Sequence, residues 1–122
     1  MKAVLKNYDQ SPRKTRLVAD MIRGKNLYRA LSELHHLPKR AGATFEKLLR
    51  SAYANAKVQD SEGALSLEGL YVKEVRVESG ITLKRSQPRS KGMAHPIRRR
   101  RSHITVTLDK HIPRVKTPVK KN

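Results

Sequence analysis

Three segments of the first sixty residues carry hydrophobic side chains at helical spacing. The first helix is predicted to open at Ser11-Pro12, because serine is a favoured N-cap and proline suits the first helical position. Its predicted apolar face consists of Leu17, Val18, Met21 and Ile22. Gly24 is a natural stop for this helix. A short strand is expected just before it, from Lys2 to Tyr8.

The second and third helices follow closely. Asn26 can cap the second, whose apolar positions are Leu27, Ala30, Leu31 and Leu34, and Pro38 marks the next boundary. The third has the longest apolar stripe, made of Ala41, Phe45, Leu48, Leu49, Ala52 and Ala56. Gly42 near its start costs about 1 kcal/mol relative to alanine, which the stripe offsets. Residues 59–63 are expected to form a loop.

From Leu70 onward the hydrophobic period changes to two, which is typical of half-buried strands. The residues expected on the buried faces are Tyr71, Val75 and Val77 and, far downstream, Ile104, Val106 and Leu108. Because the segment between these strands is poor in apolar residues, we expect an antiparallel hairpin with a long protruding end. The predicted fold class is α+β, with three helices packed on a small antiparallel sheet and a long protruding β-hairpin.

Charge divides the chain into two unequal parts. Residues 1–79 hold 15 basic and 9 acidic side chains, whereas residues 80–122 hold 13 basic side chains and one acid, Asp109. The net charges are +6 and +12, within a formal charge of +18 for the whole chain. This balance predicts a polyanionic partner, with nucleic acid first and an anionic membrane surface second. The first part is expected to be a folded body and the second mostly an electrostatic arm.

The arm, at about residues 81–102, is the strongest candidate for RNA binding. Its cationic candidates before and after the tip are Lys84, Arg85, Arg98, Arg99, Arg100 and Arg101. The expected tip consists of Pro88, Arg89, Ser90, Lys91, Gly92, Met93, Ala94 and His95, where Gly92 permits a tight reversal. Guanidinium groups meet phosphate oxygens with two donors at once and also stack on bases. Strands flank the run of charges, which favours a binding arm over a solvated, disordered tail.

The arm has almost no side chains with which to build a core. At strand rise, ten residues on each side of the hairpin would reach about 33 Å. An isolated two-stranded ribbon is marginally stable in water, even without repulsion between like charges. We therefore expect the arm to be ordered by its partner.

A second basic cluster, Arg13, Lys14 and Arg16, occupies the first turns of the first helix. The helix dipole makes cations mildly unfavourable there. A phosphate docked on the free N–H groups and the basic side chains would account for the arrangement. An ordinary solvated face is the alternative.

Other functional classes find little support. The chain has no cysteine, which excludes disulfides and thiolate zinc sites. Its histidines (His35, His36, His95, His103 and His111) have no carboxylate or nucleophile at a suggestive spacing, so no catalysis, metal or cofactor is expected. No stretch is as long and apolar as a membrane-spanning helix, which needs about 20 consecutive apolar residues. The first residues lack the apolar run of a signal peptide, so a cytosolic or organelle-interior location is expected.

A helix-turn-helix DNA-binding protein with a basic arm is the main alternative. The first helix, the Gly24 turn and the second helix have roughly the required lengths. The second helix, however, offers a thin set of outward residues for reading base edges, namely Tyr28, Arg29, Ser32 and Glu33. Most of the positive charge also lies in the arm rather than beside that helix.

Several motifs, in this order and spacing, resemble the bacterial type of the universal large-subunit ribosomal protein L-twenty-two family. They are Ser11-Pro12-Arg13-Lys14, Ile22-Arg23-Gly24-Lys25, Ser51-Ala52-Tyr53-Ala54-Asn55-Ala56, Leu70-Tyr71-Val72, Leu83-Lys84-Arg85, Pro88-Arg89-Ser90-Lys91-Gly92 and Ser102-His103-Ile104-Thr105-Val106. The similarity spans residues 2 to about 109. Ser90, Met93 and His95-Pro96 depart from what family members commonly carry at the tip.

The resemblance implies a structural constituent of the large ribosomal subunit, in the cytoplasm or in an organelle. Its body would lie near the peptide exit, and its hairpin would thread between helices of 23S-type rRNA to line the nascent-peptide tunnel. Implied partners are large-subunit rRNA, neighbouring ribosomal proteins and the nascent peptide, and the protein would support assembly. Carried over by position, the rRNA-binding set also includes Ser11, Arg13, Lys14, Arg16, Arg23, Lys25 and His103. Neither membrane association nor a homo-oligomer is expected.

The expected organisation is a single domain at residues 1–110, which includes the arm, followed by a basic tail at residues 111–122. The tail contains Pro113 and Pro118 and lies beyond the resemblance. It is expected to be extended or disordered.

Overall fold

The computed structural model describes residues 1–60 and 65–110. The expected loop at 59–63 falls partly, and the expected tail at 111–122 wholly, outside these residues. The elements in chain order are β1 (Lys2–Tyr8), α1 (Pro12–Ile22), α2 (Leu27–His35), α3 (Arg40–Gln59), a 3-10 turn η1 (Leu67–Gly69), β2 (Tyr71–Pro88), a second 3-10 turn η2 (Ser90–Gly92) and β3 (Ala94–Asp109). The α+β prediction is confirmed.

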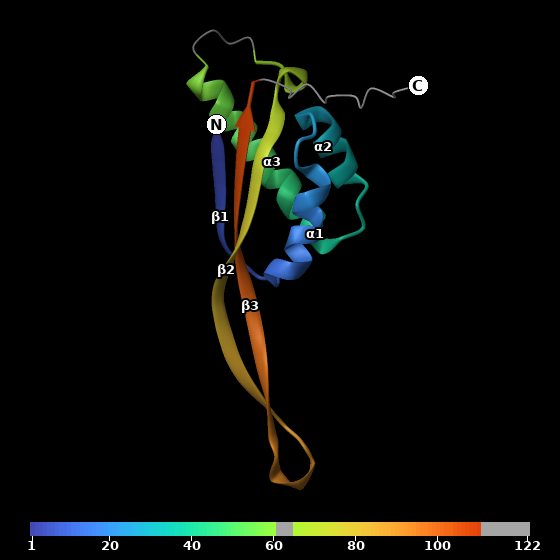
Figure 1. Ribbon diagram of the computed structural model, residues 1–122, viewed down its shortest axis with the longest axis vertical. Helices are drawn as coiled ribbons and strands as arrows, with labels where there is room; N and C mark the ends of the chain where they lie inside the picture. Colours follow the sequence, from blue (N-terminus) through green and yellow to red (C-terminus); the bar gives the residue numbers. More distant parts are fainter. Residues whose placement is uncertain (61–64, 111–122) are drawn as a thin grey trace, which may run out of the picture.

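Within residues 1–60 and 65–110, the sheet has three antiparallel strands in the order β1-β3-β2, so β3 lies in the middle. The three helices cover one face of its upper part, and β2 and β3 continue beyond the body as a long two-stranded ribbon (Figure 1). Pairing of β2 with β3 runs from Tyr71 opposite Asp109 to Pro88 opposite Ala94. Strand β1 pairs with β3 only as far as Ser102. The predicted protruding hairpin is therefore present.

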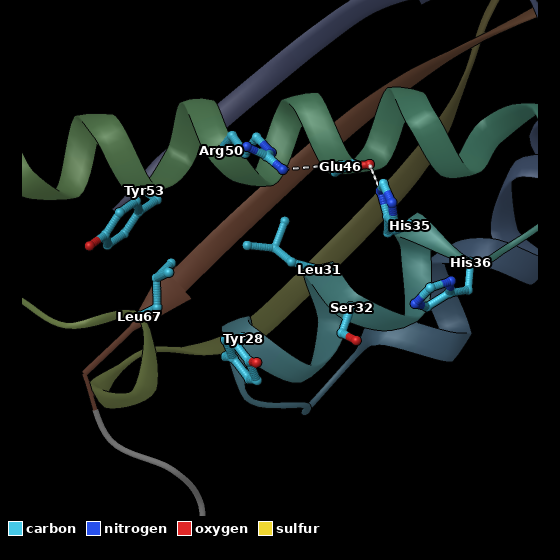
Figure 2. Close-up of a pocket in the computed structure, with 9 residues that line it drawn as sticks. All are labelled: Tyr28, Leu31, Ser32, His35, His36, Glu46, Arg50, Tyr53 and Leu67. Atoms are coloured by element: carbon cyan, nitrogen blue, oxygen red, sulfur yellow. Dashed lines mark hydrogen bonds and ion pairs between the residues drawn. The ribbon is translucent and has the colours of Figure 1, made fainter.

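The core lies between the helices and the sheet. All six residues of the predicted α3 stripe are buried, with Phe45 at 0% exposure. Gly42 lets the start of α3 pack closely on the end of α2, because a Cβ there would lie 3.3 Å from the carbonyl oxygens of Leu34 and Leu37. Beyond this contact a groove opens between α2 and α3 (Figure 2).

The predicted apolar face of α1 was partly wrong. Leu17 is 56% and Met21 37% exposed, whereas Val18 and Ile22 are buried as expected. The buried face runs through Thr15, Val18, Ala19 and Ile22. These positions follow the i, i+3, i+4, i+7 spacing of one helical face, from which Leu17 and Met21 are displaced.

The predicted alternation of buried and exposed residues in β2 was wrong at its first residue. Val72 is fully buried instead of Tyr71, which is half-buried, while Val75 and Val77 face the core as expected. The register with β3 shifts between Val72 and Glu74, which marks a bulge at Lys73. A bulge adds one residue to its strand, so the inward and outward positions exchange there.

Candidate nucleic-acid interface

The arm presents cations on both of its faces. Residues directly opposite each other in an antiparallel pair share a face. Lys84 pairs with Arg98 and Thr82 with Arg100, which places these three cations on one face. Arg85, opposite Ile97, and Arg99, opposite Leu83, lie on the other. Every residue from Lys84 to Arg100 is exposed.

The tip is a tight reversal around Lys91 and Gly92. Both residues have positive φ angles, 59° and 68°. The Arg89 N–H donates to the carbonyl oxygen of Met93 at 2.7 Å and closes the loop. The predicted role of Gly92 is confirmed, and all eight predicted tip residues are exposed. No local sequence pattern indicates the left-handed conformation of Lys91.

A groove of about 370 Å³ joins the start of α1 to the base of the arm. It brings together five of the predicted residues: Ser11, Arg13 and Arg16 from the α1 side, with Arg100 and Arg101 from β3. Its lining contains four arginines and no acid. The positive charge predicted separately for the arm and for α1 is therefore continuous across the junction.

The first N–H groups of α1 lack a side-chain cap. Ser11 occupies the predicted N-cap position, but its side chain makes no capping hydrogen bond. The Thr15 hydroxyl donates to the Ser11 carbonyl oxygen at 3.0 Å instead. Uncapped N–H groups and the positive end of the helix dipole favour an anion at this end of the groove.

Gly80 sets the geometry of the junction. Pairing shifts between Ser79 and Thr82, so the strand bulges where it leaves the body. A Cβ on Gly80 would lie 3.1 Å from the backbone carbon and oxygen of Arg101, closer than side chains normally approach. Ser79, Gly80 and Thr82 also line the groove, although they were not predicted as site residues. A glycine inside a strand pattern is the sequence signal that could have identified this junction.

Two predicted RNA-binding arginines on α1 bond to the edge of β2. Arg16 donates from Nε and Nη2 to the carbonyl oxygen of Val77, at 3.2 and 3.1 Å. Arg23 donates from Nη2 to the carbonyl oxygen of Val75 at 2.9 Å, and its Nη1 lies 2.9 Å from Asp20 Oδ1. Residues 16 and 23 are seven apart, so they lie on the same face of α1. From there they reach the carbonyl groups of two alternate residues of β2, an edge strand whose free carbonyl groups point outward. They hold α1 against the sheet, and Arg16 still lines the groove.

Arg16→Met and Arg23→Met are each expected to lower the free energy of unfolding by about 1 kcal/mol. Each change leaves a β2 carbonyl without its charged donor, but water replaces part of the bond because both arginines are exposed. Urea denaturation would measure the difference. Arg13→Met is the control, because Arg13 is on the same helix and no such bond involves it in the described residues. Equal losses in all three variants would show that these bonds do not fix the helix.

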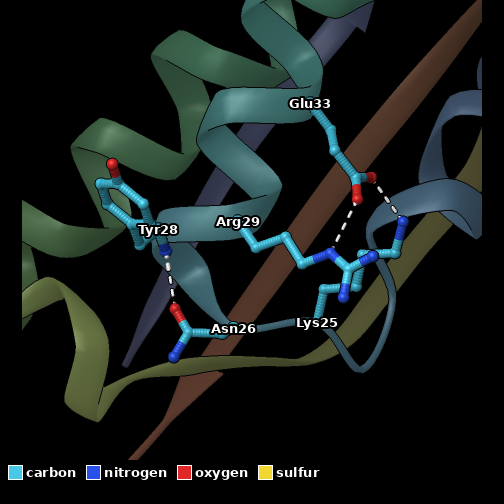
Figure 3. A network of polar contacts seen from close by, with 5 residues as sticks. All are labelled: Lys25, Asn26, Tyr28, Arg29 and Glu33. Carbon is cyan, nitrogen blue, oxygen red and sulfur yellow. Dashed lines mark hydrogen bonds and ion pairs between the residues drawn. The ribbon is translucent and has the colours of Figure 1, made fainter.

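Lys25, also predicted to bind RNA, is paired with an acid. Its ammonium group contacts Glu33 Oε2, and Arg29 Nε lies 3.1 Å from Glu33 Oε1 (Figure 3). The hydrogen bond from Lys25 is the main reason why the pKa of Glu33 is lowered. In the same loop, the Asn26 side chain accepts from the Tyr28 N–H at 2.9 Å, which confirms the predicted cap of α2. Lys25 and Arg23 lie at the far end of α1 from the groove.

The two remaining candidates have separate surroundings. Lys14 lines a different groove with Lys39 and Arg40. His103 Nδ1 accepts a hydrogen bond from the Asn7 backbone N–H at 3.0 Å, and Asn7 has a positive φ of 56°. Because Nδ1 is an acceptor, a neutral His103 carries its proton on Nε2, which leaves one ring donor for a partner.

The described residues contain no helix long and apolar enough to cross a membrane. Within the same residues, no three histidine, aspartate or glutamate side chains are grouped so as to hold a metal ion.

The fold and this surface define a class of protein: a small, strongly basic α+β body that projects a cationic β-hairpin. Residues 3–109 match the family described as "Ribosomal protein L22p/L17e", and the chain belongs to this family. It is therefore a ribosomal protein, of a family whose members are structural rather than catalytic.

Similar proteins described as "Large ribosomal subunit protein uL22" occur in several bacteria. The relative from Flavobacterium johnsoniae is 49% identical, over 87% of this chain and 77% of its own length. The relative from Herpetosiphon aurantiacus is 45% identical, over 88% of this chain and 93% of its own. The relative from Geobacter sulfurreducens is 50% identical, over 80% and 86% respectively.

Proposed function

We propose that the protein binds 23S-type rRNA of the large subunit, supports assembly of that subunit and lines the nascent-peptide exit tunnel with its hairpin. The arm provides the main support for this proposal. Its ribbon bears cations on both faces, has no acid between Lys84 and Arg101, and has no core of its own. Such a ribbon is suited to a passage between RNA helices, where phosphates approach from both sides.

The groove at the base of the arm is the second proposed RNA contact. A phosphate there would meet the first N–H groups of α1 and the guanidinium groups of Arg13, Arg100 and Arg101. Arg16 would contribute charge while its Nε and Nη2 remain bonded to β2. The groove leads directly into the arm, so a single RNA strand or helix edge would follow both surfaces.

The other cations would have smaller roles. Lys14 would extend the contact along α1, and His103 would donate one hydrogen bond from Nε2. Arg23 and Lys25 would act mainly within the protein, through Val75 and Glu33. At the tip, Arg89 and Lys91 would face the tunnel. We propose residues 1–110 as one domain, in which the body fixes the direction of the arm.

The helix-turn-helix alternative has weaker support. Its recognition helix would be α2, and Arg29 on that helix is paired with Glu33. Reading of base edges in the major groove usually depends on such outward side chains. The largest concentration of charge lies instead on a two-stranded ribbon that no helix covers (Figure 1).

Photo-crosslinking from the arm in translating cells tests the proposal. Met93, at 64% exposure on the tip, would be replaced by p-benzoylphenylalanine. We expect crosslinks to large-subunit rRNA and to nascent chains. The same replacement of Val58, which is 86% exposed on α3, is the control and should give no nascent-chain product. Recovery of DNA, or of neither product, would contradict the proposal.

A further inference from the structure

A groove of about 470 Å³ lies between α2 and α3. Leu31, Tyr53 and Leu67 supply its apolar surface, and Tyr28, His35 and Arg50 stand at its rim (Figure 2). Tyr53 is fixed in place, because its hydroxyl donates to the Leu65 carbonyl oxygen at 3.2 Å and Lys57 Nζ lies 4.8 Å from its ring centre. The surface is therefore preformed.

The charges in this groove cancel. Glu46 Oε1 accepts from Arg50 Nη2 at 2.7 Å, while its Oε2 lies 3.7 Å from His35 Nδ1. The hydrogen bond from Arg50 lowers the pKa of Glu46, so the carboxylate is charged at neutral pH. The groove at the arm has four arginines and no acid, and the groove beside Lys14 has three cations and no acid. On a chain of charge +18, a groove without net positive charge is a poor site for the backbone of a polyanion.

The exposed side chains at this groove are of the kind that form the centres of protein interfaces. Tyr28 is 61% exposed, and it shares the lining of the groove with Leu31 and Leu67. Tyrosine and arginine are enriched where two proteins bury a shared surface. Glu46 Oε2 also has only a long contact with His35, so it has room for a closer donor.

We propose that this groove binds a segment of a second protein of the assembled particle. That segment would insert an aromatic or branched aliphatic side chain against Leu31 and Tyr53 and place a basic group or an N–H near Glu46. A lining without net positive charge, in which a carboxylate oxygen is an acceptor, favours such an occupant over RNA. The inference rests on the proposed ribosomal setting, but it assigns the protein-binding surface to the side of the body formed by α2 and α3.

Crosslinking in purified large subunits tests this assignment. The chain would carry p-benzoylphenylalanine in place of Tyr28, and mass spectrometry would identify the linked residue. We expect one segment of one neighbouring protein, linked next to an apolar side chain. Glu46→Gln should reduce the yield roughly fivefold, since it removes the negative charge that attracts the donor of the bound segment. Glu74→Gln, on the strand β2, removes the same charge and should leave the yield unchanged.

Four results would overturn the inference. They are a link to rRNA, a link to residues 111–122 of the same chain, no link, and a protein link that is insensitive to Glu46→Gln. In each case the chain would still be present in the subunit, so the proposed function would stand. Absence of the chain from large subunits would overturn both.

Discussion

Replacing Arg85, Arg98 and Arg99 by glutamine is expected to weaken binding to large-subunit rRNA roughly a hundredfold at physiological salt. The three guanidinium groups lie on both faces of the arm and are exposed. Each charge-assisted contact with phosphate contributes about 1 kcal/mol or more, and 1.4 kcal/mol corresponds to about tenfold in affinity. Because none of the three is in the core, the folded body should remain stable. Filter binding with purified protein and rRNA would measure the loss.

The salt dependence of binding provides a second readout of the same variant. If about ten cations of the wild-type arm and body neutralise phosphates, log affinity should fall with log salt at a slope of roughly −7 to −9. Loss of three contacts should make the slope shallower by about 2 to 3. A wild-type slope of about −2 to −3 would contradict the proposed size of the interface.

A matched control separates a specific arm contact from a general effect of charge. Lys2, Lys6 and Lys47 are exposed on the body, and replacing all three by glutamine changes the net charge by the same amount. This variant should lose much less affinity than the arm variant. Equal losses would show that net charge, and not the ribbon, drives binding.

Much of the architecture was predictable because its signals are local. The α3 stripe and the alternation of Ile104, Val106 and Leu108 depend on the periods of a helix and a strand, and all of these residues are buried. The hairpin followed from two alternating segments around a run that cannot form a core. The bulge at Lys73 was missed because it is a property of strand pairing, which a single segment does not reveal.

The candidate site was predictable in its chemistry but not in its pairings. The cations of the arm from Lys84 to Arg100 are exposed, Arg101 is half-buried at the junction, and the cations at the start of α1 lie beside the arm's base. The bonds of Arg16 to Val77 and Arg23 to Val75 span 61 and 52 residues of sequence, and no local pattern indicates them. The ion pair between Lys25 and Glu33 could not be predicted either. A lysine in a basic motif looks the same in the sequence whether or not it is paired with an acid.

The order of the arm is expected to depend on its partner. Beyond the junction, β2 and β3 pair only with each other, and the side chains from Lys84 to Arg100 are exposed. Two strands without a core are marginally stable in water, and repulsion among the cations opposes their pairing further. Helix α3, by contrast, is anchored in the core by Phe45, Leu49 and Ala52. Local opening of the arm should therefore require little free energy, while opening of α3 should require most of the free energy of unfolding.

Amide hydrogen exchange, measured on the free protein and on its complex with large-subunit rRNA, tests whether the RNA orders the arm. In the free protein, amides from Lys84 to Arg101 should exchange orders of magnitude faster than those of α3. In the complex, the arm amides should slow by about tenfold or more, because phosphate contacts hold the ribbon closed, while the α3 amides change little. Uniform protection of arm and α3 in the free protein, or an arm that exchanges equally fast with and without rRNA, would contradict the account.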